Sequence, residues 1–120
     1  MKTVILLLVL ALPVTAHAFD PWSREDVALE VTWQALHLVD TIQTRQIALN
    51  PNKYYEMNPL LGSHPSEEKI LIYMAMGTVI HALITHYLPK KCRPYFQGVT
   101  IGLSGACVVR NLQIGLEIRW

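Results

Sequence analysis

The sequence predicts an all-α membrane protein, a small helical bundle in which two helices form a transmembrane hairpin. A first helix, amphipathic or half-inserted, packs against the hairpin. The composition supports this class, because 52% of the 120 residues are apolar and only 16% are charged, against about 25% charged in soluble domains. Residues 70–88 contain no Asp, Glu, Lys or Arg. As a helix they cover about 28 Å, close to the hydrocarbon thickness of a bilayer.

Three apolar segments each carry a line of polar side chains spaced alternately by four and three residues. The lines are Glu30, Gln34, His37, Thr41 and Thr44; Thr78, His81 and Thr85; and Thr100, Ser104, Cys107 and Asn111. This spacing keeps each line on one face of a helix. Polar groups facing lipid are costly, so we expect the three lines to face one another, or water, in an internal polar seam.

The first helix is expected over about residues 24–49. Ser23, with Asp26 three residues later, resembles a capping box at its start, and Asn50-Pro51 ends it. It carries too many polar residues for a helix surrounded by lipid. It therefore either packs its polar face against partners or lies in the membrane interface.

Two more helices follow. The second begins near Pro65 with acidic residues in its first turn, and it runs to about residue 88. The third covers about residues 95–116. Its face opposite the polar line carries Gly98, Gly102 and Gly105. Small residues in such a row are typical of close helix packing, within the chain or against a second copy or another protein.

The first 18 residues resemble a secretory signal, with Lys2, an apolar run and Ala16-His17-Ala18. Cleavage would leave 19–120 as a single helical membrane domain; the alternative is an uncleaved anchor helix. The basic turn 89–94 favours the cytoplasm. We therefore expect a bacterial inner-membrane protein with 19–69 in the periplasm and the first helix external or half-inserted. The competing arrangement has this helix crossing fully.

Several short motifs together resemble a family of small bacterial three-helix integral membrane proteins of unknown function. The motifs are Asp40-x-x-x-Thr44, Glu56-x-Asn58-Pro59, the basic turn between two apolar helices, and Asn111. The resemblance covers roughly 33–111 and implies three crossing helices, with the Glu-x-Asn-Pro loop joining the first two. It implies no activity. The signal-like segment and His81, where a lysine is expected, depart from the pattern.

The leading functional hypothesis is a non-enzymatic accessory or assembly subunit of a bacterial envelope complex, with no cofactor. Phosphate loops, nucleophile elbows and CxxC pairs are absent from the sequence. The net charge of +1 supplies no basic field for nucleic acid. The expected partners are membrane lipid and a larger membrane complex or further copies of the chain.

A second hypothesis is a small ligand-, metal- or haem-binding membrane protein, and a third is an ion or proton path along the seam. His37 and His81 would hold haem if their lines meet, and Glu30, His37 and Asp40 would bind Zn²⁺ or relay protons. A lone helical histidine more often hydrogen-bonds a neighbour. The candidate residues are Glu30, His37, Asp40, Thr44, Glu56, Asn58, His81, Ser104, Arg110 and Asn111.

Two of these candidates carry more specific expectations. Glu56 is expected to accept hydrogen bonds from free amides at the start of the second helix, in a rigid turn with Asn58 and Pro59. Arg110, the lone charge deep in the third helix, is expected either to reach the membrane surface or to pair with an acid near Glu30 or Glu56.

Overall fold

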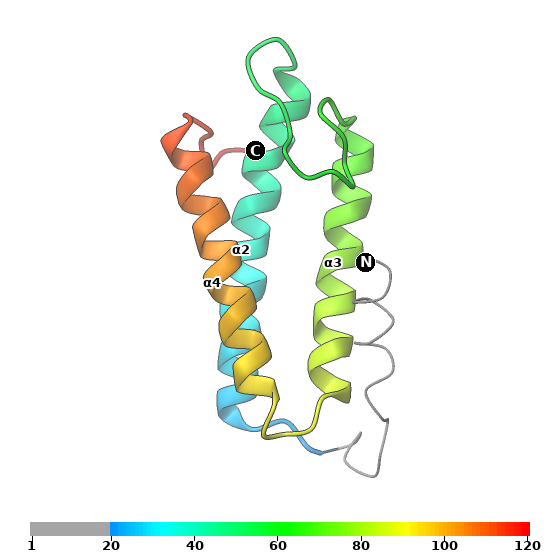
Figure 1. Ribbon diagram of the computed structural model, residues 1–120, viewed down its shortest axis with the longest axis vertical. Helices are drawn as coiled ribbons and strands as arrows, with labels where there is room; N and C mark the ends of the chain where they lie inside the picture. Colours follow the sequence, from blue (N-terminus) through cyan, green and yellow to red (C-terminus); the bar gives the residue numbers. More distant parts are fainter. Residues whose placement is uncertain (1–19) are drawn as a thin grey trace.

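The structure, a computed structural model, describes residues 20–120, which contain three helices and no strand (Figure 1). They are α2 (Arg24–Leu49), α3 (Glu67–Tyr87) and α4 (Arg93–Gln113). The all-helical prediction is confirmed, and the helix ends lie within three residues of those expected. The segment predicted as a signal, residues 1–18, lies outside the described residues.

Local sequence explains where the helices begin and end. The predicted capping box is present: the Ser23 hydroxyl accepts from the Asp26 amide at 3.0 Å, and Asp26 accepts from the Ser23 amide at 2.9 Å. Ser66 caps α3 in the same way, accepting from the Lys69 amide. After α4 the chain turns at Gly115, whose φ of +95° is a conformation that glycine adopts without strain.

Helix α2 is the central element, and both other helices pack along it (Figure 1). It points in the same direction as α4 and opposite to α3. At one end Asp26 of α2 meets Arg93 of α4 at 3.2 Å. At the other end Arg45 of α2 pairs with Glu67 of α3 at 2.5 Å. Helices α3 and α4 converge at the 88–92 turn and diverge toward the opposite end.

The expected transmembrane hairpin of the second and third helices stays a prediction, because α3 is the one helix of residues 20–120 that is long and apolar enough to span a membrane. The first helix was expected to pack against this hairpin, and α2 is the helix that both α3 and α4 contact most. The two ends of α2 also lie at opposite ends of α3. If α3 crosses a bilayer, α2 therefore cannot lie flat along one membrane surface. The contacts of α2 with the other two helices extend from Asp26, which meets α4, to Arg45, which meets α3.

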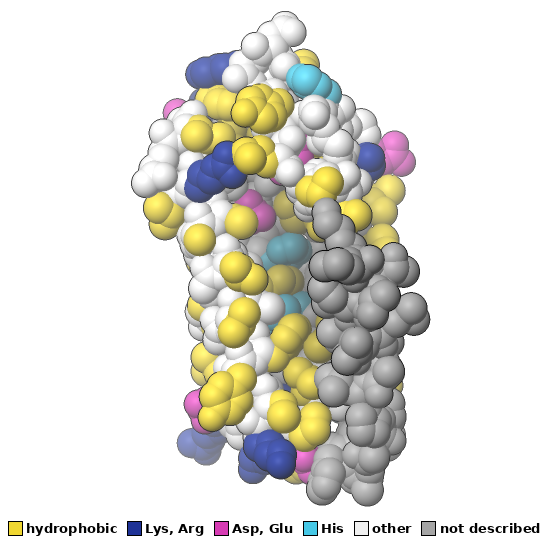
Figure 2. Space-filling view, in the orientation of Figure 1, with side chains coloured by type: hydrophobic (Ala, Val, Ile, Leu, Met, Phe, Trp, Pro, Cys, Tyr) yellow, Lys and Arg dark blue, Asp and Glu magenta, His cyan; other side chains and the backbone are white. Residues whose placement is uncertain are grey.

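Among the described residues, more polar than hydrophobic side chains are buried, and many large apolar side chains are exposed. The buried polar residues are Asp26, Glu30, Thr41, Gln43, Thr44, Gln46, His81, Thr85, Arg93 and Gln97. Large apolar side chains such as Val31, Ile80 and Leu103 are exposed instead. Figure 2 shows hydrophobic side chains between two ends where charged ones gather. Helix α3 is long and apolar enough to span a membrane.

A small apolar cluster holds the loop between α2 and α3. Leu61, Ile70 and Met74 are buried together, with Ala48 and Tyr73 packed against them. Lys69 donates to the Leu61 carbonyl at 2.9 Å, and the Glu56 amide donates to the Ser63 carbonyl at 2.8 Å. These contacts fold the loop back over the end of α2 and fix where Glu56 and Asn58 lie.

Two glycine substitutions should affect stability in opposite directions. Gly115→Ala places a Cβ at φ +95°, where L residues are strained, and should lower the free energy of unfolding by about 1 kcal/mol. Gly102→Ala meets no atom within 4 Å in mid-helix and should leave it unchanged or raise it by up to about 1 kcal/mol. Thermal unfolding in one detergent compares the two, and equal melting temperatures would contradict the turn geometry.

Candidate functional site

The Glu30 carboxylate lies inside the half of the bundle next to the 88–92 turn, which we call the lower half (Figure 1). It is only 7% exposed and accepts hydrogen bonds from all three helices. Gln34 donates at 2.9 Å, His81 at 3.0 Å, Thr85 at 3.1 Å and Gln97 at 3.2 Å. Of the buried side-chain polar atoms in residues 20–120, only Gln97 Oε1 has no hydrogen-bond partner. This network is therefore almost fully satisfied, which suits a structural role.

A buried ion pair closes the end of the bundle next to the 88–92 turn. Arg93 is completely buried and donates to Asp26 at 3.2 Å. Its other N–H groups donate to the backbone carbonyls of Asp20, Pro21, Thr85, His86 and Leu88. Arg93 was predicted to be part of the basic turn 89–94. In the structure it ties the start of α2 to the end of α3.

The spacing of the polar lines contained a sign of these missed residues. Extending the α4 line backward by the same steps of three and four reaches Gln97 and then Arg93. Extending the α2 line backward by four reaches Asp26. The polar line of α2 is therefore one turn longer than predicted, and that of α4 is about two turns longer. The basic neighbours Lys90 and Lys91, together with Pro94, made that turn look like a loop.

Hydrogen bonding leaves two proton arrangements for His81. Its Nδ1 faces the Glu30 carboxylate and must donate. Its Nε2 lies 2.8 Å from the Thr100 hydroxyl, which is also 3.0 Å from the carbonyls of Phe96 and Gln97. If Thr100 donates to a carbonyl, Nε2 donates as well and the imidazole is cationic. If Thr100 donates to Nε2, the imidazole is neutral.

Stacked aromatic rings divide the polar seam. Trp33 lies between the two predicted histidines, with ring centroids 3.6 Å from His81 and 4.5 Å from His37, and Phe96 stacks on the far side of His81. The imidazoles are thus parallel and separated by an indole, and they do not point at one shared position as two haem ligands would. Within residues 20–120, no chain of hydrogen bonds joins Glu30 to Asp40.

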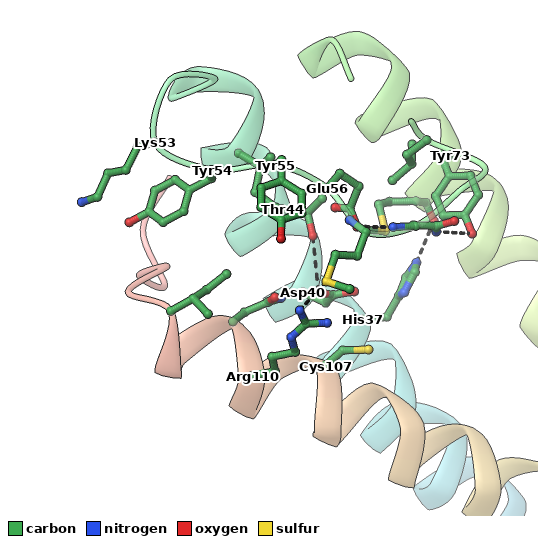
Figure 3. Close-up of a pocket in the computed structure, with 17 residues that line it drawn as sticks. His37, Asp40, Thr44, Lys53, Tyr54, Tyr55, Glu56, Tyr73, Cys107 and Arg110 are labelled. Atoms are coloured by element: carbon green, nitrogen blue, oxygen red, sulfur yellow. Dashed lines mark hydrogen bonds between the residues drawn. The ribbon is translucent and has the colours of Figure 1, made fainter. Parts of the chain in front are cut away.

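Beyond the stack lies a cavity of about 750 Å³, which we call the chamber (Figure 3). Its walls come from α2, α4, the N-terminal half of α3 and the 53–58 loop. Figure 2 shows a hollow on this face with acidic and histidine side chains at its base. The chamber brings together most of the predicted candidates: His37, Asp40, Thr44, Glu56, Asn58, Arg110 and Asn111. Ser104 is not among its lining residues.

Asp40 is held by one oxygen and open at the other. Its Oδ1 accepts from the Asn111 amide at 2.7 Å and lies 3.4 Å from the Thr44 hydroxyl. The Asn111 amide also lies 3.2 Å from Gln43 Oε1, which orients it. No donor among residues 20–120 reaches Oδ2. The Asp40 carboxylate is thus fixed through Oδ1, and Oδ2 is a free hydrogen-bond acceptor.

His37 is oriented in a similar way. Its Nε2 lies 2.8 Å from the Met74 carbonyl and must donate there, so in the neutral imidazole Nδ1 keeps a lone pair. Nothing among residues 20–120 donates to that lone pair. Gly77 lets His37 come close to α3, because a Cβ at this position would lie 3.1 Å from His37 Nε2.

The loop residues differ from expectation. Glu56 Oε1 accepts from the amides of Met57 and Asn58, both at 2.8 Å, so it stabilises its own loop and does not cap α3. Asn58 accepts from the Leu60 amide and donates to the Tyr73 hydroxyl. Arg110 contacts the Met57 sulfur and forms no ion pair with an acid of residues 20–120. Its position on the chamber wall explains this, because it faces the loop.

The glycine row of α4 lies outside the chamber. A Cβ at Gly98, Gly102 or Gly105 would meet no atom within 4 Å, so this face of α4 packs against nothing in the described chain. Cys107 lines the chamber and its thiol is free. Residues 20–120 contain no group of three or more His, Cys, Asp and Glu side chains placed to hold a metal ion.

Searches against protein-family models, curated proteins and solved structures found no match to this chain. The resemblance drawn from the short motifs is therefore untested. The chamber has to be interpreted from its own geometry.

The buried Arg93 should be essential for folding. Arg93→Met leaves Asp26 and five backbone carbonyls without their donor, and it should lower the free energy of unfolding by about 3 kcal/mol or more. Lys91→Met, two residues away and exposed, should change it by less than about 0.5 kcal/mol. Unfolding of both variants in the same detergent measures the difference. Similar stabilities would show that Arg93 is not buried.

Proposed function

We propose that this chain is an integral membrane protein that binds a small polar ligand in the chamber without catalysing a reaction on it. One observation carries the proposal. Three residues of α2 and the 53–58 loop line a single cavity and each have an acceptor atom that no donor of residues 20–120 reaches: Asp40 Oδ2, Glu56 Oε2 and, in the neutral imidazole, His37 Nδ1. Fixed polar groups converging on a partly apolar cavity are the usual character of a ligand site.

The distribution of charge supports a membrane location. Charged residues bracket stretches without exposed charges: Glu25 and Arg45 on α2, Lys69 in the first turn of α3 and Lys90 after its end, and the buried Arg93 and exposed Arg110 on α4. Between them lie 19, 20 and 16 residues, which rise about 24–30 Å as helices. Asp26, Glu30 and Asp40 fall within the first stretch, but they face the interior. A bilayer core about 30 Å thick matches these lengths.

In this proposal all three helices cross, and the chamber lies near the membrane face that carries the 50–66 loop. The start of α2 is then on the same side as the 88–92 turn. The nine Lys and Arg residues of 20–120 divide into four near that turn and five near the loop. This difference is too small to orient the protein by the positive-inside rule. An inner-membrane location with the loop in the periplasm remains a prediction.

Cysteine labelling tests the crossing of α2. In a Cys107→Ser background, Glu25→Cys should react with a membrane-impermeant maleimide from the same side of sealed vesicles as native Cys92. Ser63→Cys should react from the other side, because α2 runs the full length of α3. Reaction of Glu25→Cys together with Ser63→Cys would instead favour a first helix that lies on the surface.

Protection of Cys107 tests ligand binding. The protein in lipid nanodiscs is treated with iodoacetamide in the presence of small fragments, and alkylation is followed by mass spectrometry. A fragment in the chamber should slow alkylation of Cys107, which lines the cavity, and leave Cys92 unchanged, because Cys92 lies outside it. If every fragment that slows Cys107 slows Cys92 equally, or none slows it, the binding function is refuted.

A second candidate is the accessory or assembly subunit expected from the sequence. The specific observation in its favour is the unoccupied row Gly98, Gly102 and Gly105 on α4, which lets another helix approach closely. Gly102→Ile should therefore weaken an oligomer or complex and shift its migration in mild detergent. Equal migration of variant and wild type, with Gly102→Ala as the matched control, would remove this candidate.

A further inference from the structure

We infer that the ligand of the chamber is a small organic cation, an ammonium group on a compact apolar body. This inference rests on the proposed binding function and adds the chemical class of the ligand. It follows from which polar groups of the chamber are already used, which are not, and what forms the remaining walls.

Several donors of the chamber are used within the protein. The Asn111 amide donates to Asp40 and the Asn58 amide to the Tyr73 hydroxyl. The Tyr54 hydroxyl donates to the Gly115 carbonyl at 3.3 Å, and His37 Nε2 donates to the Met74 carbonyl. The unused donors belong to Arg110, which contacts the Met57 sulfur, to Lys53, which is directed away from Asp40, and to the Tyr55 and Tyr73 hydroxyls; the unused atoms of Asp40 and Glu56 are acceptors. A ligand that supplies several N–H donors at one point matches these acceptors, and an ammonium group supplies three.

The charges of the chamber also favour a cationic ligand. The charges of His37 and Glu56 both act on Asp40, in opposite senses, and neither Asp40 nor Glu56 forms an ion pair within residues 20–120. Arg110 contacts the Met57 sulfur. Lys53 lies over the Tyr54 ring, 5.1 Å from its centroid, and Figure 3 shows it directed away from Asp40. A cation between the two carboxylates would relieve their repulsion.

The other walls favour an organic cation over a bare metal ion. No group of three metal-ligating side chains is formed in residues 20–120. The lining includes Tyr54, Tyr55 and Tyr73, whose ring faces attract cations, and Leu61, Met74 and Ile114 as apolar surface. At about 750 Å³ the chamber has room for an aromatic or branched amine.

Three probes of nearly equal shape and different charge test this class: benzylammonium, benzyl alcohol and benzoate. The measurement is again protection of Cys107 in nanodiscs, with Zn²⁺ alone as a fourth probe. We expect benzylammonium to protect at concentrations at least tenfold lower than the neutral or anionic probe. Asp40→Asn keeps the acceptor used by Asn111 and should weaken the amine at least tenfold.

Matched variants separate a direct role from a structural one. Glu56→Gln keeps the acceptor used by the loop amides and should also weaken benzylammonium. Arg110→Gln removes a competing cation and should leave amine binding unchanged or tighten it, whereas it would weaken benzoate. Glu25→Gln, at the far end of α2, should change nothing. The melting temperature of each variant identifies a folding defect.

The outcomes distinguish this inference from the function on which it rests. Better protection by benzoate, equal protection by all three probes, or protection by Zn²⁺ alone would overturn the cationic amine while leaving a binding site in the chamber. Absence of protection by all four probes also overturns it, and the fragment experiment then decides separately whether the chamber binds anything.

Discussion

The buried carboxylate of Glu30 is the constraint on which the rest of the structure depends. An ionisable group surrounded by apolar helices and, in our proposal, by lipid is costly unless it is fully hydrogen-bonded. Its donors come from α2 itself, from His81 and Thr85 of α3 and from Gln97 of α4. Sliding any one helix along another would leave this carboxylate partly unsatisfied. The polar interior thus fixes one register, as apolar packing does in a soluble core.

The chamber exists because the hydrogen bonds between helices are placed differently in the two halves of the bundle. In the lower half, His81 bonds Thr100 and Arg93 bonds the end of α3, so α3 and α4 are tied to each other as well as to α2. In the upper half each is tied to α2 alone, α3 by His37 and α4 by Gln43 and Asp40. The two helices are therefore free to diverge there. The 53–58 loop covers part of the space that opens.

Much of the fold follows from the sequence, because the helix ends depend on local chemistry such as Ser23 with Asp26, and the inward faces follow from the spacing of polar residues. Which helices contact each other most did not follow. Chain order favours pairing α3 with α4, whereas the complementarity of polar lines favours α2 between them. The chamber was not predictable either, because its walls depend on the divergence of two helices and on the path of the 53–58 loop. The candidates Asp40, Glu56 and Asn111 could be named from their residue types, but not the free atoms they present.

The four stacked rings of His37, Trp33, His81 and Phe96 have a consequence for how such a protein can exist in a membrane. A water-filled hollow that reaches halfway through a bilayer risks becoming a leak for ions, which would dissipate the gradients that a cell maintains. In our proposal the stacked rings, among them an indole that is 7% exposed, lie across the interior next to the chamber. A ligand that entered the chamber would then meet these rings before it reached the other half of the bundle.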